Sequence, residues 1–211
     1  MGQEHTDEEL LAAYQQGDPG AFEALLRRYR APLFTFLLRM LGDRERAEDL
    51  AQETFLRIVK GAQAWEERAR FQSWMYAIAR NLCTDRARRD RFRKTESLDQ
   101  EPVEGAGGTI VDGVPDPGPL PDQAAESERL RPLLQRALLS LPPDQREVFI
   151  LREQAGLPFR EIAAITGANE NTVKSRMRYA LDGLRKALAA AGVDADTAGP
   201  GTPLGARFSR A

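Results

Sequence analysis

The sequence contains very little of what metal sites, disulfides and catalytic pairs require. Its single cysteine, Cys83, excludes an internal disulfide and fits a reducing compartment such as the cytoplasm. The only histidine, His5, lies near the N-terminus, which argues against a metal site and against a Ser/His or Cys/His pair. No glycine-rich phosphate-binding loop follows a strand-like segment. We therefore expect no enzyme activity, no metal and no other cofactor.

Long apolar runs and strand-like alternation are also missing. No apolar run is long enough to cross a membrane. The acidic N-terminal residues MGQEHTDEEL contain no hydrophobic segment, so they are typical of neither a signal peptide nor a transit peptide. Hydrophobic residues still make up 42% of the chain, which is enough for real cores. The sequence therefore predicts a cytoplasmic, all-α protein.

The formal net charge is only −2, but the charges are unevenly distributed. Residues 84–94 contain six basic and two acidic side chains, whereas residues 97–123 contain six acids and no base. Because binding depends on local fields, the low overall charge does not argue against DNA binding. We predict a flexible acidic linker rich in proline and glycine at 96–124 between domains at 1–95 and 125–188, with a disordered tail at 189–211.

Capping signals predict where helices begin and end. A Thr6–Glu9 capping box begins the first helix, and Asp18-Pro19 begins a second, in which Pro32 predicts a kink. Asp43 begins a third helix, and a fourth is expected over residues 71–94. In the second domain, helical spacing continues over residues 130–141, and a capping box at Asp144 predicts a helix over 145–155.

Residues 159–186, FREIAAITGANENTVKSRMRYALDGLRK, have the pattern of a helix-turn-helix. Gly167 ends the first helix and Asn169 caps the second. One face of the second helix is apolar, and the other presents groups that bind base edges and phosphates: Asn171, Lys174, Ser175 and Arg178. The alternative is a helical hairpin with a solvated basic face. Small Ala163, the turn glycine and the uncharged hydrogen-bonding groups together favour DNA binding.

Two faces of the first domain allow two interpretations each. The third helix presents acidic residues beside apolar Leu56, which suits docking on a basic partner but also an ordinary solvated face. The fourth helix combines aromatic residues with a basic end, as single-stranded DNA binding requires. Core packing is the alternative for the aromatic residues, and it is favoured more for Trp74 than for Trp65 or Tyr76.

Three motifs together resemble one family. They are AEDLAQETFLRIVK at 47–60, FQSWMYAIARNLCTDRARR at 71–89 and LPPDQREVFILREQAGLPFREIAAITGANENTVKSR at 141–176. They resemble bacterial RNA polymerase sigma factors of the small extracytoplasmic-function type, over residues 22–93 and 130–186. The resemblance implies two all-helical domains, region two and region four, and a dissociable polymerase subunit that directs promoter-specific transcription initiation.

The resemblance also implies roles for individual residues. Docking on the coiled coil of the polymerase β′ subunit falls to Asp49, Gln52, Glu53 and Leu56. Recognition and opening of the −10 element fall to Trp65, Phe71, Trp74, Asn81, Arg86, Arg88 and Arg89. Recognition of the duplex −35 element falls to Arg160, Asn171, Thr172, Lys174, Ser175, Arg178 and Tyr179. The acidic linker is implied to thread the polymerase's RNA path, and many relatives have an anti-sigma factor as a further partner.

One departure from the family pattern concerns promoter choice. Where the family commonly has an arginine-rich stretch, this chain has Tyr179, Leu181 and Asp182. The promoter sequence that relatives prefer therefore cannot be assigned to this chain. Two rival hypotheses remain at this stage. A stand-alone helix-turn-helix regulator would bind duplex DNA without polymerase, and a nucleic-acid-processing enzyme would need a cluster of carboxylates or metal ligands that the sequence does not suggest.

Overall fold

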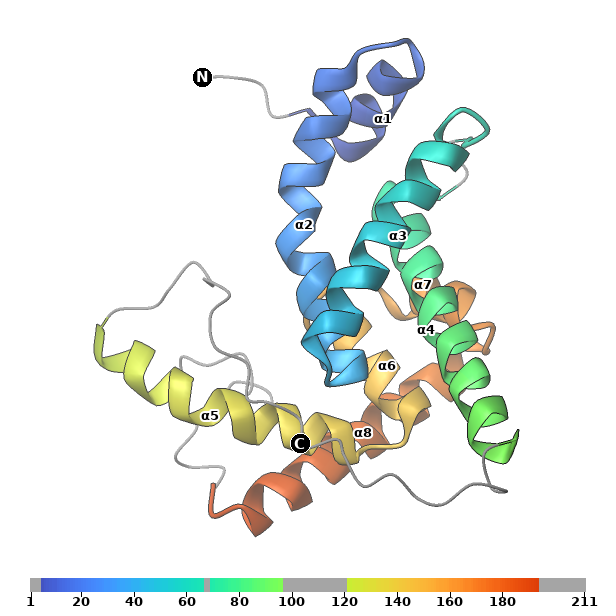
Figure 1. Cartoon of the computed structure of the whole chain (residues 1–211). Coiled ribbons are helices and arrows are strands. Elements are labelled where there is room, and N and C mark those ends of the chain that lie inside the picture. Colours follow the sequence, from blue (N-terminus) through green and yellow to red (C-terminus); the bar gives the residue numbers. More distant parts are fainter. Residues whose placement is uncertain (1–4, 67–68, 97–120, 194–211) are drawn as a thin grey trace. The chain divides into compact units, whose positions relative to one another are not determined.

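The computed structural model describes residues 5–66, 69–96 and 121–193, and every regular element in these ranges is an α-helix. The helices are α1 (Asp7–Gln15), α2 (Pro19–Leu41), α3 (Arg44–Ala62), α4 (Phe71–Glu96), α5 (Pro121–Ser140), α6 (Pro143–Glu153), α7 (Phe159–Thr166) and α8 (Glu170–Ala190) (Figure 1). They form two compact units. The first contains α1 to α4, and the second is built on α5, α6 and α8, with α7 preceding α8 in the chain. None of the described helices is both long and apolar enough to cross a membrane.

The capping signals place most helix ends correctly. Thr6 and Glu9 form the expected reciprocal capping box at α1. The Asp18 side chain accepts a hydrogen bond from the Gly20 amide at the start of α2. Gly42 ends α2 with a left-handed φ of 71°, which glycine adopts without steric cost. α2 continues through Pro32 to Leu41 as a single helix.

Three boundaries differ from the expected ones. α6 begins at Pro143, with no side-chain cap, instead of after Asp144, because proline suits a first helical position that needs no amide. α5 begins at Pro121, inside the expected linker, and α8 continues to Ala190, inside the expected tail. The rest of both expected segments, residues 97–120 and 194–211, lies outside the described residues.

The core of the first unit forms around α2, which packs against α1, α3 and α4. Aromatic pairs join α2 to α4: the ring centroids of Phe36 and Tyr76 lie 5.0 Å apart, and those of Tyr29 and Phe71 lie 5.4 Å apart. The largest fully buried side chains of this unit are Leu11, Leu25, Leu33, Phe36, Leu37, Ile58, Phe71, Met75 and Tyr76.

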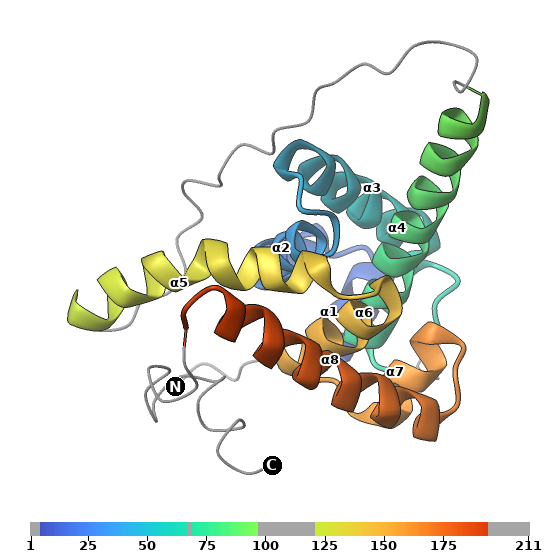
Figure 2. The ribbon, with the colours of Figure 1, turned by 90° about the horizontal axis from the view of Figure 1, so that it is seen from below.

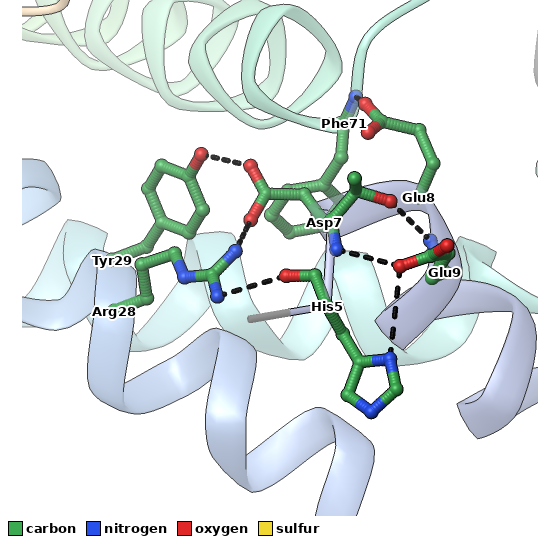
Figure 3. Close-up of polar contacts among 8 residues, drawn as sticks. His5, Asp7, Glu8, Glu9, Arg28, Tyr29 and Phe71 are labelled. Carbon is green, nitrogen blue, oxygen red and sulfur yellow. Dashed lines mark hydrogen bonds and ion pairs between the residues drawn. The ribbon is translucent and has the colours of Figure 1, made fainter. Parts of the chain in front are cut away.

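A polar cluster attaches α1 to α2. Asp7 accepts hydrogen bonds from the Arg28 guanidinium and from the Tyr29 hydroxyl (Figure 3). Arg28 also donates to the carbonyl oxygen of His5 at 3.1 Å. Burial, and then the hydrogen bond to Asp7, raise the pKa of Tyr29 above its ordinary value. The cluster therefore fixes α1 on the rest of the unit.

The core of the second unit lies where α8 packs against α6 and α5, and α5 and α8 run side by side (Figure 2). Gly183 permits a close approach, because a Cβ atom there would lie 2.6 Å from Cδ2 of Leu141. The buried side chains of α6 and α8 include Val148, Ile150, Leu151, Val173, Met177 and Leu184. This packing sets the rotation of α8 about its own axis.

Candidate nucleic-acid interface

One face of α8 is exposed, and we call it the reading face: Asn171, Lys174, Ser175, Arg178 and Tyr179. Its first turn is fixed by Asn169, whose Oδ1 accepts a hydrogen bond from the Thr172 amide at 2.8 Å. Thr172 itself is half-buried. Because the opposite side of α8 is buried in the core, the reading face points outward and could enter a major groove.

The cations of the reading face are held by neighbours on the same helix. Lys174 forms an ion pair with Glu170, with 2.6 Å between Nζ and Oε1. The Arg178 guanidinium lies over the Tyr179 ring, 5.1 Å from its centroid. Exposed pairs of this kind contribute little stability, so a DNA phosphate or base could replace them at low cost.

The elements beside the reading face are tied together. An open hollow lies between the starts of α6 and α8, and it is lined by Asp144, Gln145 and the first turns of α8. Arg176 of α8 forms an ion pair with Asp144 of α6 at 3.0 Å. On α7, Arg160 is exposed. Side chains from α6 and α8 thus converge beside the reading face.

The exposed side of α3 carries the residues expected to dock on polymerase, which we call the docking face: Asp49, Gln52, Glu53 and Leu56. Asp49 and Gln52 are exposed, and Glu53 is half-buried and accepts a hydrogen bond from Arg57 at 2.9 Å. Leu56 is 53% exposed, and Val59, one turn later, is 38% exposed. Two large apolar side chains beside carboxylates suit a partner that is both basic and apolar.

Trp65 and Trp74 form a half-buried pair, the tryptophan pair, at the N-terminal end of α4. Their ring centroids lie 6.3 Å apart with an angle of 42° between the rings. Trp74 lies close to Gly61, where a Cβ atom would be 3.1 Å from its Cζ2. Since both rings keep some exposed surface, they could stack on an unpaired base.

Two aromatic residues of α4 are placed differently from expectation. Phe71, expected at the −10 element, is fully buried and packs on Tyr29 and Trp74. Tyr76 is 1% exposed, and burial raises its pKa to about 12. Both belong to the core, so neither ring offers a face to a base. The buried face of α4 also includes Met75 and small Ala79.

Beyond the aromatic residues, α4 presents a mixed basic surface. Asn81, Arg88 and Arg89 are exposed, and Arg86 is half-buried. Two acids partly neutralise these arginines: Asp85 pairs with Arg88 at 3.2 Å, and Asp90 lies 3.7 Å from Arg86 and 3.0 Å from Arg46 of α3. The positive charge predicted for this segment is therefore present on the surface and organised by carboxylates.

Sequence reasoning missed two residues of α1 that contact the connection between α3 and α4. Nε2 of Gln15 donates to the carbonyl oxygens of Ala62 and Trp65, at 2.7 and 3.0 Å. Oε1 of Glu8 accepts from the Phe71 amide at 2.9 Å. The partners are 47 to 63 residues apart in the chain, so no local pattern could have indicated them.

Comparisons with known proteins agree with the division into two units. Residues 25–93 match the family model "Sigma-70 region 2", and residues 131–182 match "Sigma-70, region 4". The chain is 33% identical to the ECF RNA polymerase sigma factor SigW of Bacillus subtilis over 174 residues, covering 82% of this chain and 92% of that protein. It is 34% identical to SigE of Mycolicibacterium smegmatis, covering 82% of this chain and 65% of that protein.

Two solved structures have a similar fold. One is the sigma factor RpoE in complex with the anti-sigma factor NepR from Bartonella quintana, with a TM-score of 0.63, 26% identity, and coverage of 80% of this chain and 96% of that one. The other is CnrH in complex with the cytosolic domain of CnrY, with a TM-score of 0.61, 23% identity, and coverage of 88% and 99%. The second likeness concerns the fold alone.

Proposed function

This chain belongs to the sigma-70 family, in its extracytoplasmic-function group, and we propose how its two units divide the work of promoter-specific transcription initiation. The first unit docks on core RNA polymerase and opens the −10 element, and the second recognises the −35 element. The exposed reading face on a capped and buried recognition helix carries the proposal. The site of action is the cytoplasm, where core polymerase transcribes.

At the −35 element, α8 enters the major groove of duplex DNA with its N-terminal half. Asn171, Lys174, Ser175 and Arg178 are exposed on one side, with hydrogen-bonding groups and cations of the types that bind base edges and phosphates. Arg160 of α7 and Tyr179, both exposed, take further phosphate or base contacts. Half-buried Thr172 supports the first turn through its amide, which is bonded to Asn169.

At the −10 element, the first unit stabilises unpaired DNA. Trp65 and Trp74 supply aromatic surface, and Asn81, Arg86, Arg88 and Arg89 lie further along α4 for the sugar-phosphate strand. Extracting a base from the stack costs a few kcal/mol, and stacking on an aromatic ring returns about 1–3 kcal/mol per base. Opening can therefore proceed without nucleotide hydrolysis by this chain.

The decisive experiment is run-off transcription with purified core polymerase. We expect transcripts to start at discrete promoters only when this protein is added, and changes in either promoter element to reduce them. Tight promoter binding without any run-off product would contradict the proposal. The rival, a stand-alone helix-turn-helix regulator, leaves the docking face and the region-two match without a role. A stand-alone regulator would have to bind the promoter with the same sequence specificity when core polymerase is absent.

Docking through α3 has its own test. Gln52→Ala combined with Glu53→Ala should weaken binding to core polymerase and spare the fold, because neither side chain belongs to the core. A Glu23→Ala variant is a matched control, because Glu23 is an exposed acid on α2. Full core affinity in the double variant would show that the docking surface lies elsewhere.

An antagonist of the anti-sigma type is a further proposed partner, by analogy with the Bartonella complex.

A further inference from the structure

Helix α1 contacts both ends of the connection between α3 and α4. The Gln15 amide binds the carbonyl oxygens of Ala62 and Trp65, where α3 ends. The Glu8 carboxylate accepts a hydrogen bond from the amide of Phe71, where α4 begins (Figure 3). α1 is itself fixed on α2 by Asp7. The two ends of the connection are therefore held by one anchored helix.

These contacts add partners for backbone groups at the two helix ends, where the Ala62 carbonyl also accepts from the Trp65 amide at 3.1 Å. Ala62 is the last residue of α3 and Phe71 is the first of α4, so the carbonyl of one and the amide of the other have no partner in their own helix. A glutamine amide has two donor hydrogens and can serve two carbonyls at once. A carboxylate at a helix N-terminus also interacts favourably with the helix dipole. Glu8 and Gln15 thus suit their positions chemically.

The same contacts determine where the tryptophan pair lies. Gln15 holds the backbone of Trp65, and Glu8 holds the first residue of α4, three residues before Trp74. We propose that Gln15 and Glu8 are positioning residues for −10 recognition, which hold the Trp65 and Trp74 rings, 6.3 Å apart, where their exposed surface can stack on an unpaired base. This inference rests on the proposed function of the tryptophan pair. Neither positioning residue touches DNA.

The test uses the full chain with core polymerase and forked promoter templates whose −10 segment is single-stranded. Gln15→Met removes both donors at similar side-chain length, and Gln16→Met is the matched control at the exposed neighbouring position. The readout is the affinity for the cognate −10 segment divided by the affinity for segments with single-base changes. We expect Gln15→Met to lower this ratio about tenfold, as the loss of two hydrogen bonds allows, and Gln16→Met to leave it unchanged.

Glu8 provides a second arm. Glu8→Gln retains an oxygen that accepts from the Phe71 amide and should keep the ratio, whereas Glu8→Leu removes the acceptor and should lower it. A purely structural role would weaken core binding and all templates equally and leave the ratio unchanged. If the wild type prefers the cognate −10 segment but Gln15→Met and Glu8→Leu leave the ratio unchanged, the inference is overturned and the proposed function of the tryptophan pair is not. A wild type without any −10 preference overturns the proposed function of the tryptophan pair, and the inference with it.

Discussion

The two units hold their proposed recognition groups in different ways. The reading face lies on one helix, which is capped by the adjacent Asn169 and fixed by buried residues of that same helix. In the first unit, Trp65 lies in a connection and Trp74 on α4, and their placement depends on Gln15 and Gly61. A recognition helix can be built from its own sequence, whereas a recognition site between helices requires tertiary support. Recognition and stability should therefore be separable in the second unit and coupled in the first.

The largest effect should come from Phe71, which joins the core to the tryptophan pair. Phe71→Ala should lower the free energy of unfolding of the first unit by about 3–5 kcal/mol, because it empties a fully buried site. Both tryptophans of the chain belong to this unit, so urea unfolding followed by tryptophan fluorescence reports on it selectively. Phe71→Leu, which keeps an apolar side chain, should still bind −10 DNA. A stable Phe71→Leu variant without −10 binding would restore a direct contact for Phe71.

Alkaline pH should destabilise the first unit next most strongly. Burial raises the pKa of Tyr76 to about 12 and also raises that of Tyr29. Below pH ~10 both hydroxyls stay protonated in the folded and in the unfolded chain, so their ionisation does not change the stability. Above pH ~10 only the unfolded chain releases these protons, so the free energy of unfolding falls by roughly 1.4 kcal/mol per pH unit for each tyrosine. For Tyr76 the loss continues to about pH 12. Tyr76→Phe should reduce the slope measured by urea unfolding between pH 9 and 11, and an unaltered slope would exclude Tyr76 as a cause.

Changes to the reading face should affect DNA affinity and leave stability unchanged. Arg178→Ala should cost about 1–3 kcal/mol of −35 binding by the polymerase complex. Stability should stay within about 0.5 kcal/mol, because the side chain is exposed. Lys186→Ala is the matched control, since Lys186 is an exposed cation in the later turns of α8 that pairs with Asp182. Equal losses of −35 affinity in Arg178→Ala and Lys186→Ala would mean that only overall charge matters. A large loss of stability in Arg178→Ala would show that recognition and stability are coupled in the second unit as well.

The smallest effect should come from the helix cap of α8. Asn169→Ala removes the acceptor for the Thr172 amide and should cost about 1 kcal/mol of stability in the second unit. Asn169→Asp keeps an acceptor oxygen and should be close to neutral. Because the second unit contains no tryptophan, far-ultraviolet circular dichroism of the whole chain is the suitable measurement. Equal stability in the alanine variant would indicate that packing alone fixes the start of α8.

The sequence predicted best what local chemistry determines. Thr6, Asp18, Asp43 and Asn169 all cap helices as expected, because a cap needs only the next three residues. The all-α fold and the exposed positions of α8 follow in the same way from helical spacing. Phe71 was misplaced because an aromatic ring beside cations fits a core and a DNA surface equally well until a partner such as Tyr29 is known.

The contacts of α1 have a consequence for the order in which the protein acquires its shape. Gln15 leaves the ribosome 47 and 50 residues ahead of its two acceptors, and Glu8 leaves it 63 residues ahead of Phe71. Because such distant contacts close large loops, they form late and slow the folding of the segment that contains them. A nascent chain that has not yet passed Phe71 therefore lacks the Glu8 contact, and with it the support that the start of α4 receives from α1.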